Sequence, residues 1–221
     1  MNKNILSLLF LTSFIISVQA QNIRFNTYFG GAFDDKVNSY YNASNFYQGK
    51  INGGFLWGSG MEFRIRNNVG TELSYMHQDT KAPIEYYDHN SGTVKNTNFH
   101  LGFNYILIGA IRSLNVSRKI EPYAGLMAGI AMINATNPGN ENSDVIGKFA
   151  WGLRCGTNIW VSKIVGIKFQ AQLLSVSQAI GGGFYVGTGG SGTTVSNYSS
   201  MYQFGMGAGI AFKLAPLIKT R

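Results

Sequence analysis

The sequence predicts an all-β protein, an eight-stranded antiparallel up-and-down transmembrane β-barrel. Three observations predict it: about eight segments of alternating apolar and polar residues, connections that alternate in length, and an unusual composition. Charged residues make up 13% of the chain, whereas an ordinary soluble domain has about 25%. After residue 20, no stretch reaches the roughly 18 continuous apolar residues of a membrane-spanning helix. A chain that is apolar but finely interrupted is typical of membrane-crossing strands.

The N-terminus predicts export. One lysine precedes an apolar run at residues 5–16, and the small residues Val18 and Ala20 then occupy the positions that a signal peptidase reads. The run is shorter than the roughly 20 residues that a spanning helix needs, which disfavours the alternative of a retained anchor helix. We therefore expect residues 1–20 to be a cleaved signal peptide and residues 21–221 to form a single outer-membrane β-barrel domain.

Alternation is clearest near the C-terminus. One face there carries Tyr202, Phe204, Met206, Ala208, Ile210 and Phe212, and the other carries Gln203, Gly205, Gly207, Gly209, Ala211 and Lys213. Successive side chains of a strand point to opposite faces, whereas a helix would scatter these residues and be destabilised by the glycines. Similar patterns predict strands at about residues 23–30, 52–65, 69–75, 99–107, 120–133, 148–161 and 167–173. The stretch 120–133 is the least regular of these, because both its faces hold apolar residues.

The connections between these segments indicate an orientation. Short turns are expected at 66–68, 115–119 and 162–165, and longer polar loops at 34–49, 80–96, 134–147 and 179–199. Outer-membrane barrels have short periplasmic turns and longer extracellular loops. The pattern predicts four extracellular loops and two periplasmic termini.

We expect the polar face of each strand to point inward and the apolar face to point outward. The predicted inward face carries charges of both signs, at Arg24, Glu62, Arg64, Glu72, Lys148, Arg154 and Lys168. An eight-stranded barrel is just wide enough to be filled by side chains, and an isolated buried charge is very costly. We therefore expect the two glutamates to pair with several of the basic residues and form a polar plug. The alternative is a narrow or gated pore whose selectivity these charges set.

Aromatic residues near the expected strand ends predict girdles at the membrane surfaces. The candidates are Tyr28, Trp57, Tyr75, Tyr105, Tyr123, Trp151, Trp160 and Tyr202. Tyr28 and Trp160 have inward parity, which a local β-bulge would explain.

The expected loops supply groups for contact with a partner. Aromatic residues suited to recognition gather in the first two loops, at Tyr40, Tyr41, Phe46, Tyr47, Tyr86 and Tyr87. The last loop is rich in glycine, serine and threonine and should be mobile. It lacks the Gly-Lys-Ser/Thr of a phosphate-binding loop.

No motif for catalysis, a cofactor or a metal is found. Ser74, His77 and Asp79 can be combined on paper into a catalytic triad, but a triad is recognised by geometry and no motif fixes theirs. No metal-ligand spacing occurs, and the single Cys155 excludes an internal disulfide. We expect a protein that is not an enzyme and has no cofactor.

The net charge of +8 does not predict nucleic-acid binding, because the basic residues are spread out rather than gathered in a stripe. The inward basic residues account for part of the charge. The expected periplasmic turns account for more, with Arg66, Arg118, Lys119 and Lys163.

With the strands in place, the chain resembles the small outer-membrane β-barrel family that includes the OmpA-barrel, OmpX-like and PorT-like proteins. The resemblance covers nearly all of the mature chain. It is most evident in the segment Ile120-Glu121-Pro122-Tyr123-Ala124-Gly125-Leu126-Met127-Ala128-Gly129, which looks like a strand opening common in that family, and the glycine-rich last strand ending at Phe212 also resembles the family's terminal strand. It implies an outer-membrane location in a Gram-negative envelope, but no particular activity. Such proteins usually end on an aromatic residue, whereas here residues 213–221 follow Phe212.

Three functional hypotheses remain open. The first is a non-enzymatic barrel serving envelope structure, adhesion or association with an envelope complex. The second is a small pore for ions or solutes, and the third is an enzyme acting on lipid or peptide. The expected partners are outer-membrane lipid and envelope proteins, reached through extracellular loops or periplasmic turns. A soluble periplasmic or secreted β-protein is the main architectural rival.

Overall fold

A computed structural model provides the structure of the chain. It describes residues 23–214 apart from 43–44, 67, 89–91, 115, 118, 137, 139–142 and 182–200. The expected signal peptide, the C-terminal tail and most of the glycine-rich last loop lie outside the described residues. The described strands are β1 (Ile23–Ala32), β2 (Asp35–Asn42), β3 (Asn45–Ile51), β4 (Gly54–Arg66), β5 (Val69–Asp88), β6 (Thr93–Ser113), β7 (Ile120–Thr136), β8 (Ser143–Trp160), β9 (Val165–Gly181) and β10 (Met201–Leu214).

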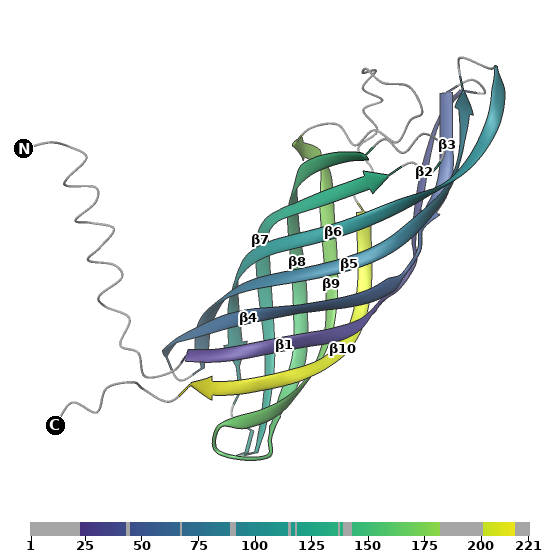
Figure 1. The fold of residues 1–221 in the computed structure, drawn as a ribbon. Coiled ribbons are helices and arrows are strands. Elements are labelled where there is room, and N and C mark those ends of the chain that lie inside the picture. Colours follow the sequence, from purple (N-terminus) through teal and green to yellow (C-terminus); the bar gives the residue numbers. More distant parts are fainter. Residues whose placement is uncertain are drawn as a thin grey trace, which may run out of the picture.

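Eight of these strands close into an antiparallel barrel, which confirms the predicted fold class (Figure 1). The ten-stranded sheet has the order β2-β3-β5-β4-β1-β10-β9-β8-β7-β6, and β5 also pairs with β6, so β1 and β4–β10 form a complete ring. The first and last strands pair side by side, with Ile23 opposite Leu214. Closure satisfies the backbone groups of every strand, as a membrane interior requires.

One end of the barrel, here named the turn end, carries three short connections. β4 leads to β5, β6 to β7 and β8 to β9 at the positions that the sequence predicted. Two of these turns are held by a serine hydroxyl: Ser117 Oγ accepts from the amides of residues 119 and 120, and Ser162 Oγ accepts from those of 164 and 165. Serine favours such turns because its side chain replaces a backbone acceptor.

The opposite end differs from the prediction of long polar loops at 34–49 and 80–96. β2 and β3 form a hairpin, β5 continues to Asp88, and β6 begins at Thr93. β3 pairs with upper β5, with Tyr47 opposite Tyr86 and Gly49 opposite Ile84. The resulting sheet rises beyond the rest of the barrel wall and is named the wing: β2, β3, residues 79–88 of β5 and 93–102 of β6 (Figure 1). Its polar composition suggested loops, but hydrogen-bonded strands above an apolar belt need no apolar outer face.

The outer face of the barrel carries a belt of exposed apolar side chains. The belt includes Phe29, Phe55, Leu73, Ile106, Ile108, Leu126, Ile130, Leu153, Phe169, Phe204, Met206 and Ile210. Paired aromatic rings lie toward the wing end of the belt, where Trp57 packs on Tyr75 at 6.0 Å and Trp151 packs on Tyr202 at 6.3 Å between ring centroids. An apolar band bordered by aromatic residues is typical of barrels that span a membrane.

In the part of the chain that the structure describes, no helix is long and apolar enough to cross a bilayer.

The barrel interior has two halves. The charged half, near the turn end, holds Arg24, Glu62, Arg64, Glu72, Glu121, Arg154, Lys168 and Lys213 with the rings of Tyr28, Tyr123 and Trp160. The apolar half, near the wing, holds Leu56, Met76, Phe99, Leu101, Phe103, Tyr105, Leu107, Ala131, Ile133, Leu174, Val176 and Met201.

The apolar half corrects one expectation. The alternation at 99–107 was assigned correctly, but its apolar face points into the barrel instead of outward. Tyr105 and Tyr123 are likewise buried inside and belong to no girdle. Parity distinguishes two faces of a strand without saying which one is inside. Because both the membrane and this half of the interior are apolar, hydrophobicity alone gave the wrong answer for β6.

Candidate functional site

The charged half is organised around the carboxylate of Glu121. Arg24 donates to it from Nη1 and Nη2 at 2.7 and 3.0 Å, and Arg64 donates from Nη1 at 2.6 Å. The indole Nε1 of Trp160 adds a bond of 3.0 Å. Glu62 lies 3.6 Å from Arg24 and 3.7 Å from Arg64. Four strands (β1, β4, β7 and β8) are thereby joined across the barrel lumen by charge-assisted bonds, which are stronger than neutral ones.

A second group centres on Glu72, further from the turn end. Arg154 Nη1 donates to Glu72 Oε2 at 2.8 Å, and Asn26 Nδ2 donates to Oε1 at 2.9 Å. The hydroxyl of Tyr28 also donates to Oε1. The same Asn26 amide contacts Glu62 Oε2 at 3.4 Å, which links this group to the one around Glu121.

Cations outnumber carboxylates in the charged half, and several of these cations lie over the faces of aromatic rings. The guanidinium of Arg154 lies 4.5 Å from the ring centroid of Tyr28, and Lys168 Nζ lies 4.2 Å from that of Tyr123. Lys213 Nζ lies 3.6 Å from the Trp160 ring. A cation over an aromatic face is attracted by the ring quadrupole, most strongly when water is excluded. The rings therefore stabilise Lys168 and Lys213, and the Tyr28 ring adds to the attraction that Arg154 already receives from Glu72.

All seven residues predicted for the interior lie inside the barrel. Arg24, Glu62, Arg64, Glu72 and Arg154 form ion pairs there, and the cation of Lys168 lies over tyrosine rings. The seventh, Lys148, is 1% exposed but comes six residues before Arg154 in β8, opposite Ala131 in the apolar half.

Sequence reasoning missed Glu121 and the interior role of three aromatic residues of the charged half, Tyr28, Tyr123 and Trp160. Glu121 opens the irregular segment at 120–133, where apolar residues on both faces hid the parity. Glu121 and Tyr123 are two residues apart and so share one face of the strand, and this parity was the signal available in the sequence. Tyr28 and Trp160 have inward parity because they point inward, and the β1–β4 and β8–β9 registers run through them without a bulge. The bulge interpretation was wrong.

Two glycines make room for these groups. A Cβ on Gly60 would lie 3.0 Å from the Tyr28 hydroxyl and closer still to Glu72 Oε1. A Cβ on Gly166 would lie 2.9 Å from the Trp160 ring. Real Cβ atoms almost never approach other atoms so closely, so glycine at these positions lets the strand backbone lie against a bulky interior side chain.

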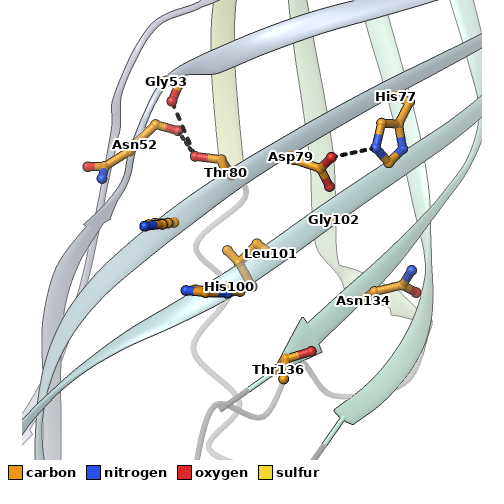
Figure 2. Close-up of a pocket in the computed structure, with 11 residues that line it drawn as sticks. Asn52, Gly53, His77, Asp79, Thr80, His100, Leu101, Gly102, Asn134 and Thr136 are labelled. Carbon is orange, nitrogen blue, oxygen red and sulfur yellow. Dashed lines mark hydrogen bonds and ion pairs between the residues drawn. The ribbon is translucent and has the colours of Figure 1, made fainter. Parts of the chain in front are cut away.

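The triad assembled on paper is not a triad in space. Ser74 is buried inside the barrel, where its hydroxyl lies 3.4 Å from the Leu107 carbonyl, whereas His77 lies on the outer face. The imidazole of His77 instead contacts Asp79 at 3.1 Å (Figure 2). It also contacts Asn104 at 2.9 Å. Serine and histidine are separated by the sheet, so no proton can pass between them. Among the described residues, no group of three or more His, Cys, Asp or Glu side chains could hold a metal ion.

The aromatic contact candidates belong to the wing. In its backbone register, Tyr40 lies opposite Phe46 and Tyr47 lies opposite Tyr86. Tyr41 is on β2, and Tyr87 is a half-buried residue of β5. These residues therefore sit on a hydrogen-bonded sheet rather than on separate loops.

The architecture was compared with those of known proteins. No protein-family model and no curated protein matches the sequence. The structure is similar to that of AlkL, an outer-membrane protein determined in lipid bilayers, with a TM-score of 0.55, 12% identity and coverage of 91% of this chain and 93% of AlkL. It is similar to the outer-membrane protein OprG of Pseudomonas aeruginosa, with a TM-score of 0.54, 8% identity and coverage of 89% and 97%. It is also similar to neisserial surface protein A, with a TM-score of 0.52, 15% identity and coverage of 86% of this chain and 97% of that protein. The chain has the fold of the small outer-membrane β-barrels.

Proposed function

We propose that the protein is a non-enzymatic, non-conducting barrel of the outer membrane that holds its wing outside the cell for adhesion or for association with another envelope component. In this orientation the turn end faces the periplasm. One observation carries the proposal: paired charges cross the lumen in one half, and the other half is filled mainly by apolar side chains, with the buried Gln78, Lys148 and Gln203 among them.

The two halves favour closure for different physical reasons. In the charged half, an ion would have to separate Arg24 and Arg64 from Glu121, which leaves buried charges without partners. In the apolar half, Phe103 and Tyr105 stack at 6.0 Å and both are at most 1% exposed. A narrow apolar constriction excludes ions because they cannot be hydrated there.

The wing supplies the recognition surface in this proposal. It extends the sheet beyond the belt and places Tyr40, Phe46, Tyr47 and Tyr86 in paired register. Tyrosine provides a large contact area at low cost in side-chain entropy. A paired sheet also pre-organises such a surface, whereas a flexible loop must be ordered on binding.

Planar-bilayer recording of the purified chain tests closure. We expect no steady single-channel steps from the wild type. Glu121→Ala removes the carboxylate that joins Arg24 and Arg64 in the charged half, and Phe103→Ala removes one of the two stacked rings in the apolar half. Each single variant leaves the other half filled and should not conduct, whereas the double variant should conduct. Its current should favour anions, because cations outnumber carboxylates in the lumen. Lys163→Gln, an exposed change at the turn end, is the matched control. Steady steps from the wild type would favour the pore hypothesis instead.

A second experiment tests the wing. Tyr40, Tyr41, Phe46 and Tyr47 are replaced together by serine in cells that display the chain, and attachment of those cells to surfaces and to one another is measured. We expect attachment to fall to the level of cells without the protein. Heat-modifiable gel migration must stay unchanged, which shows that the barrel still folds. Attachment equal to that of the wild type would count against the wing as the recognition surface.

A further inference from the structure

A groove of about 550 Å³ lies on the wall of the barrel where the belt meets the wing (Figure 2). It is formed by two successive rows of residues across β5, β6 and β7. One row is Asp79, Gly102 and Asn134, and the next is Lys81, His100 and Thr136. The turn at Asn52 and Gly53 borders it on the β4 side.

The floor of the groove is low because Gly102 has no side chain. A Cβ there would lie 3.4 Å from Asp79 Oδ1 and 3.8 Å from Asn134 Cβ, which are ordinary contacts. The backbone of Gly102 therefore does not require glycine on steric grounds. The effect of glycine at this position is to leave space between the polar side chains of β5 and β7.

The groove opens sideways at the membrane surface. His77, at its lower edge, packs against the girdle residue Trp57 with 5.4 Å between ring centroids. The belt residues Leu73 of β5 and Ile106 of β6 lie closer to the turn end than His77 does. Aromatic rings of this kind sit at the level of lipid headgroups. A molecule that fills the groove can thus keep acyl chains against the belt.

The groups in the groove suit a phosphorylated sugar. The ammonium of Lys81 is a strong point charge for phosphate. His100, Asn134 and the 83% exposed carboxylate of Asp79 offer donors and acceptors for hydroxyl groups. We propose that the groove binds the phosphorylated sugar headgroup of a lipid in the outer leaflet. The inference rests on the proposed location of the barrel in an outer membrane.

Native mass spectrometry of the full chain in detergent, with diphosphorylated lipid A as the probe, tests the proposal. Two changes are compared with the wild type. Lys81→Gln combined with His100→Gln removes the ammonium and the imidazole from the groove, and Gly102→Val fills it. Each should weaken binding about ten-fold, the loss expected when a charge-assisted hydrogen bond is removed. Lys163→Gln keeps the same overall charge change as Lys81→Gln but lies at the turn end, and should bind like the wild type.

The controls separate a lipid from other sources of the same chemistry. Fully dephosphorylated lipid A should bind about ten-fold more weakly than the intact probe to the wild type. Equal binding by wild type and both groove variants would overturn the proposal. Displacement of lipid A by equimolar glucose 1-phosphate would also overturn it, because the site would then take a soluble sugar phosphate. Bilayer recording reports separately on closure, so a conducting barrel that loses lipid A binding in these variants would leave the inference standing.

Discussion

The two halves of the lumen differ in the side chains that fill them: one holds ion pairs, and the other holds mainly apolar groups. In the charged half, Glu121 accepts hydrogen bonds from Arg24, Arg64 and Trp160, so each partner depends on the others. In the apolar half, residues such as Phe103 and Ile133 make contacts that are individually weak and non-directional. Removing one member of a charge network leaves a buried charge unpaired, whereas removing one methyl group leaves only a small cavity. The charged half should therefore be the less tolerant of substitution.

The largest effect is expected from Glu121→Gln. The side chain keeps its shape but loses the charge that pairs with Arg24 and Arg64. Breaking a buried ion pair by neutralising one partner costs about 3–5 kcal/mol. Urea unfolding in lipid vesicles, followed by tryptophan fluorescence, measures the free energy of unfolding.

The double variant Glu121→Gln with Arg64→Gln provides the control for this loss. It removes a cation together with the anion and should recover part of the stability, because fewer charges remain uncompensated. A loss below about 1 kcal/mol in the single variant would place the Glu121 cluster among weakly coupled pairs and break the contrast between the halves.

Gly60→Ala should have the next largest effect. The added methyl group meets Glu72 Oε1 and the Tyr28 hydroxyl, which are held in place by Arg154 and by each other. Overpacking of this kind costs about 1–3 kcal/mol. Gly102→Ala is the matched control, since its Cβ would make ordinary contacts on the outer wall. Equal unfolding free energies for the two alanine variants would mean that the Glu72 group can shift freely.

The sequence predicted the barrel well because period-two alternation and turn chemistry are local. The turns at Ser117 and Ser162 and the glycine-rich face of β10 are where the pattern placed them. Inward parity also identified Arg24, Glu62, Glu72 and Arg154 as interior residues. These assignments depend on the strand alone and need no knowledge of its neighbours.

What the sequence could not predict depends on contacts between distant strands. Glu121 is joined to Arg24 across 97 residues, and nothing near it in the chain marks it as the centre of a cluster. The orientation of β6 failed for a related reason, since its Phe103 face is as apolar as a lipid-facing one. The wing was mistaken for loops because its pairing between β3 and β5 is non-local.

A smaller effect is expected from Ile133→Val in the apolar half. Ile133 is 2% exposed, and the change removes one buried methylene group at a cost of about 0.5–1.5 kcal/mol. The same urea titration measures it. A loss as large as that of Glu121→Gln would show that the apolar half is as finely specified as the charged half, and the proposed difference in tolerance would be wrong.

The smallest effect is expected outside the lumen, at Asp34 between β1 and β2. The Gly53 amide donates to its carboxylate at 2.6 Å and Lys50 contacts it at 2.8 Å, and these two bonds hold the pKa of Asp34 below its ordinary value of 3.8. A lowered pKa means that the contribution of this carboxylate to folding is fully present above pH 3.8 and is lost as the pH falls through the lowered value. Because the side chain is about half exposed, solvent screens the pair and global stability should barely change.

An NMR titration of Asp34 in the wild type should give a midpoint below 3.8, and the Gly53 amide shift should follow the same curve. In Lys50→Gln the midpoint should rise only partway toward 3.8, since the backbone bond remains and contributes most to the shift. Asp34→Asn should abolish the titration of the Gly53 amide while leaving the unfolding free energy of the barrel unchanged. A measurable loss of barrel stability in that variant would mean that the start of the wing is coupled to the lumen, and the interior alone would then not determine how the barrel tolerates substitution.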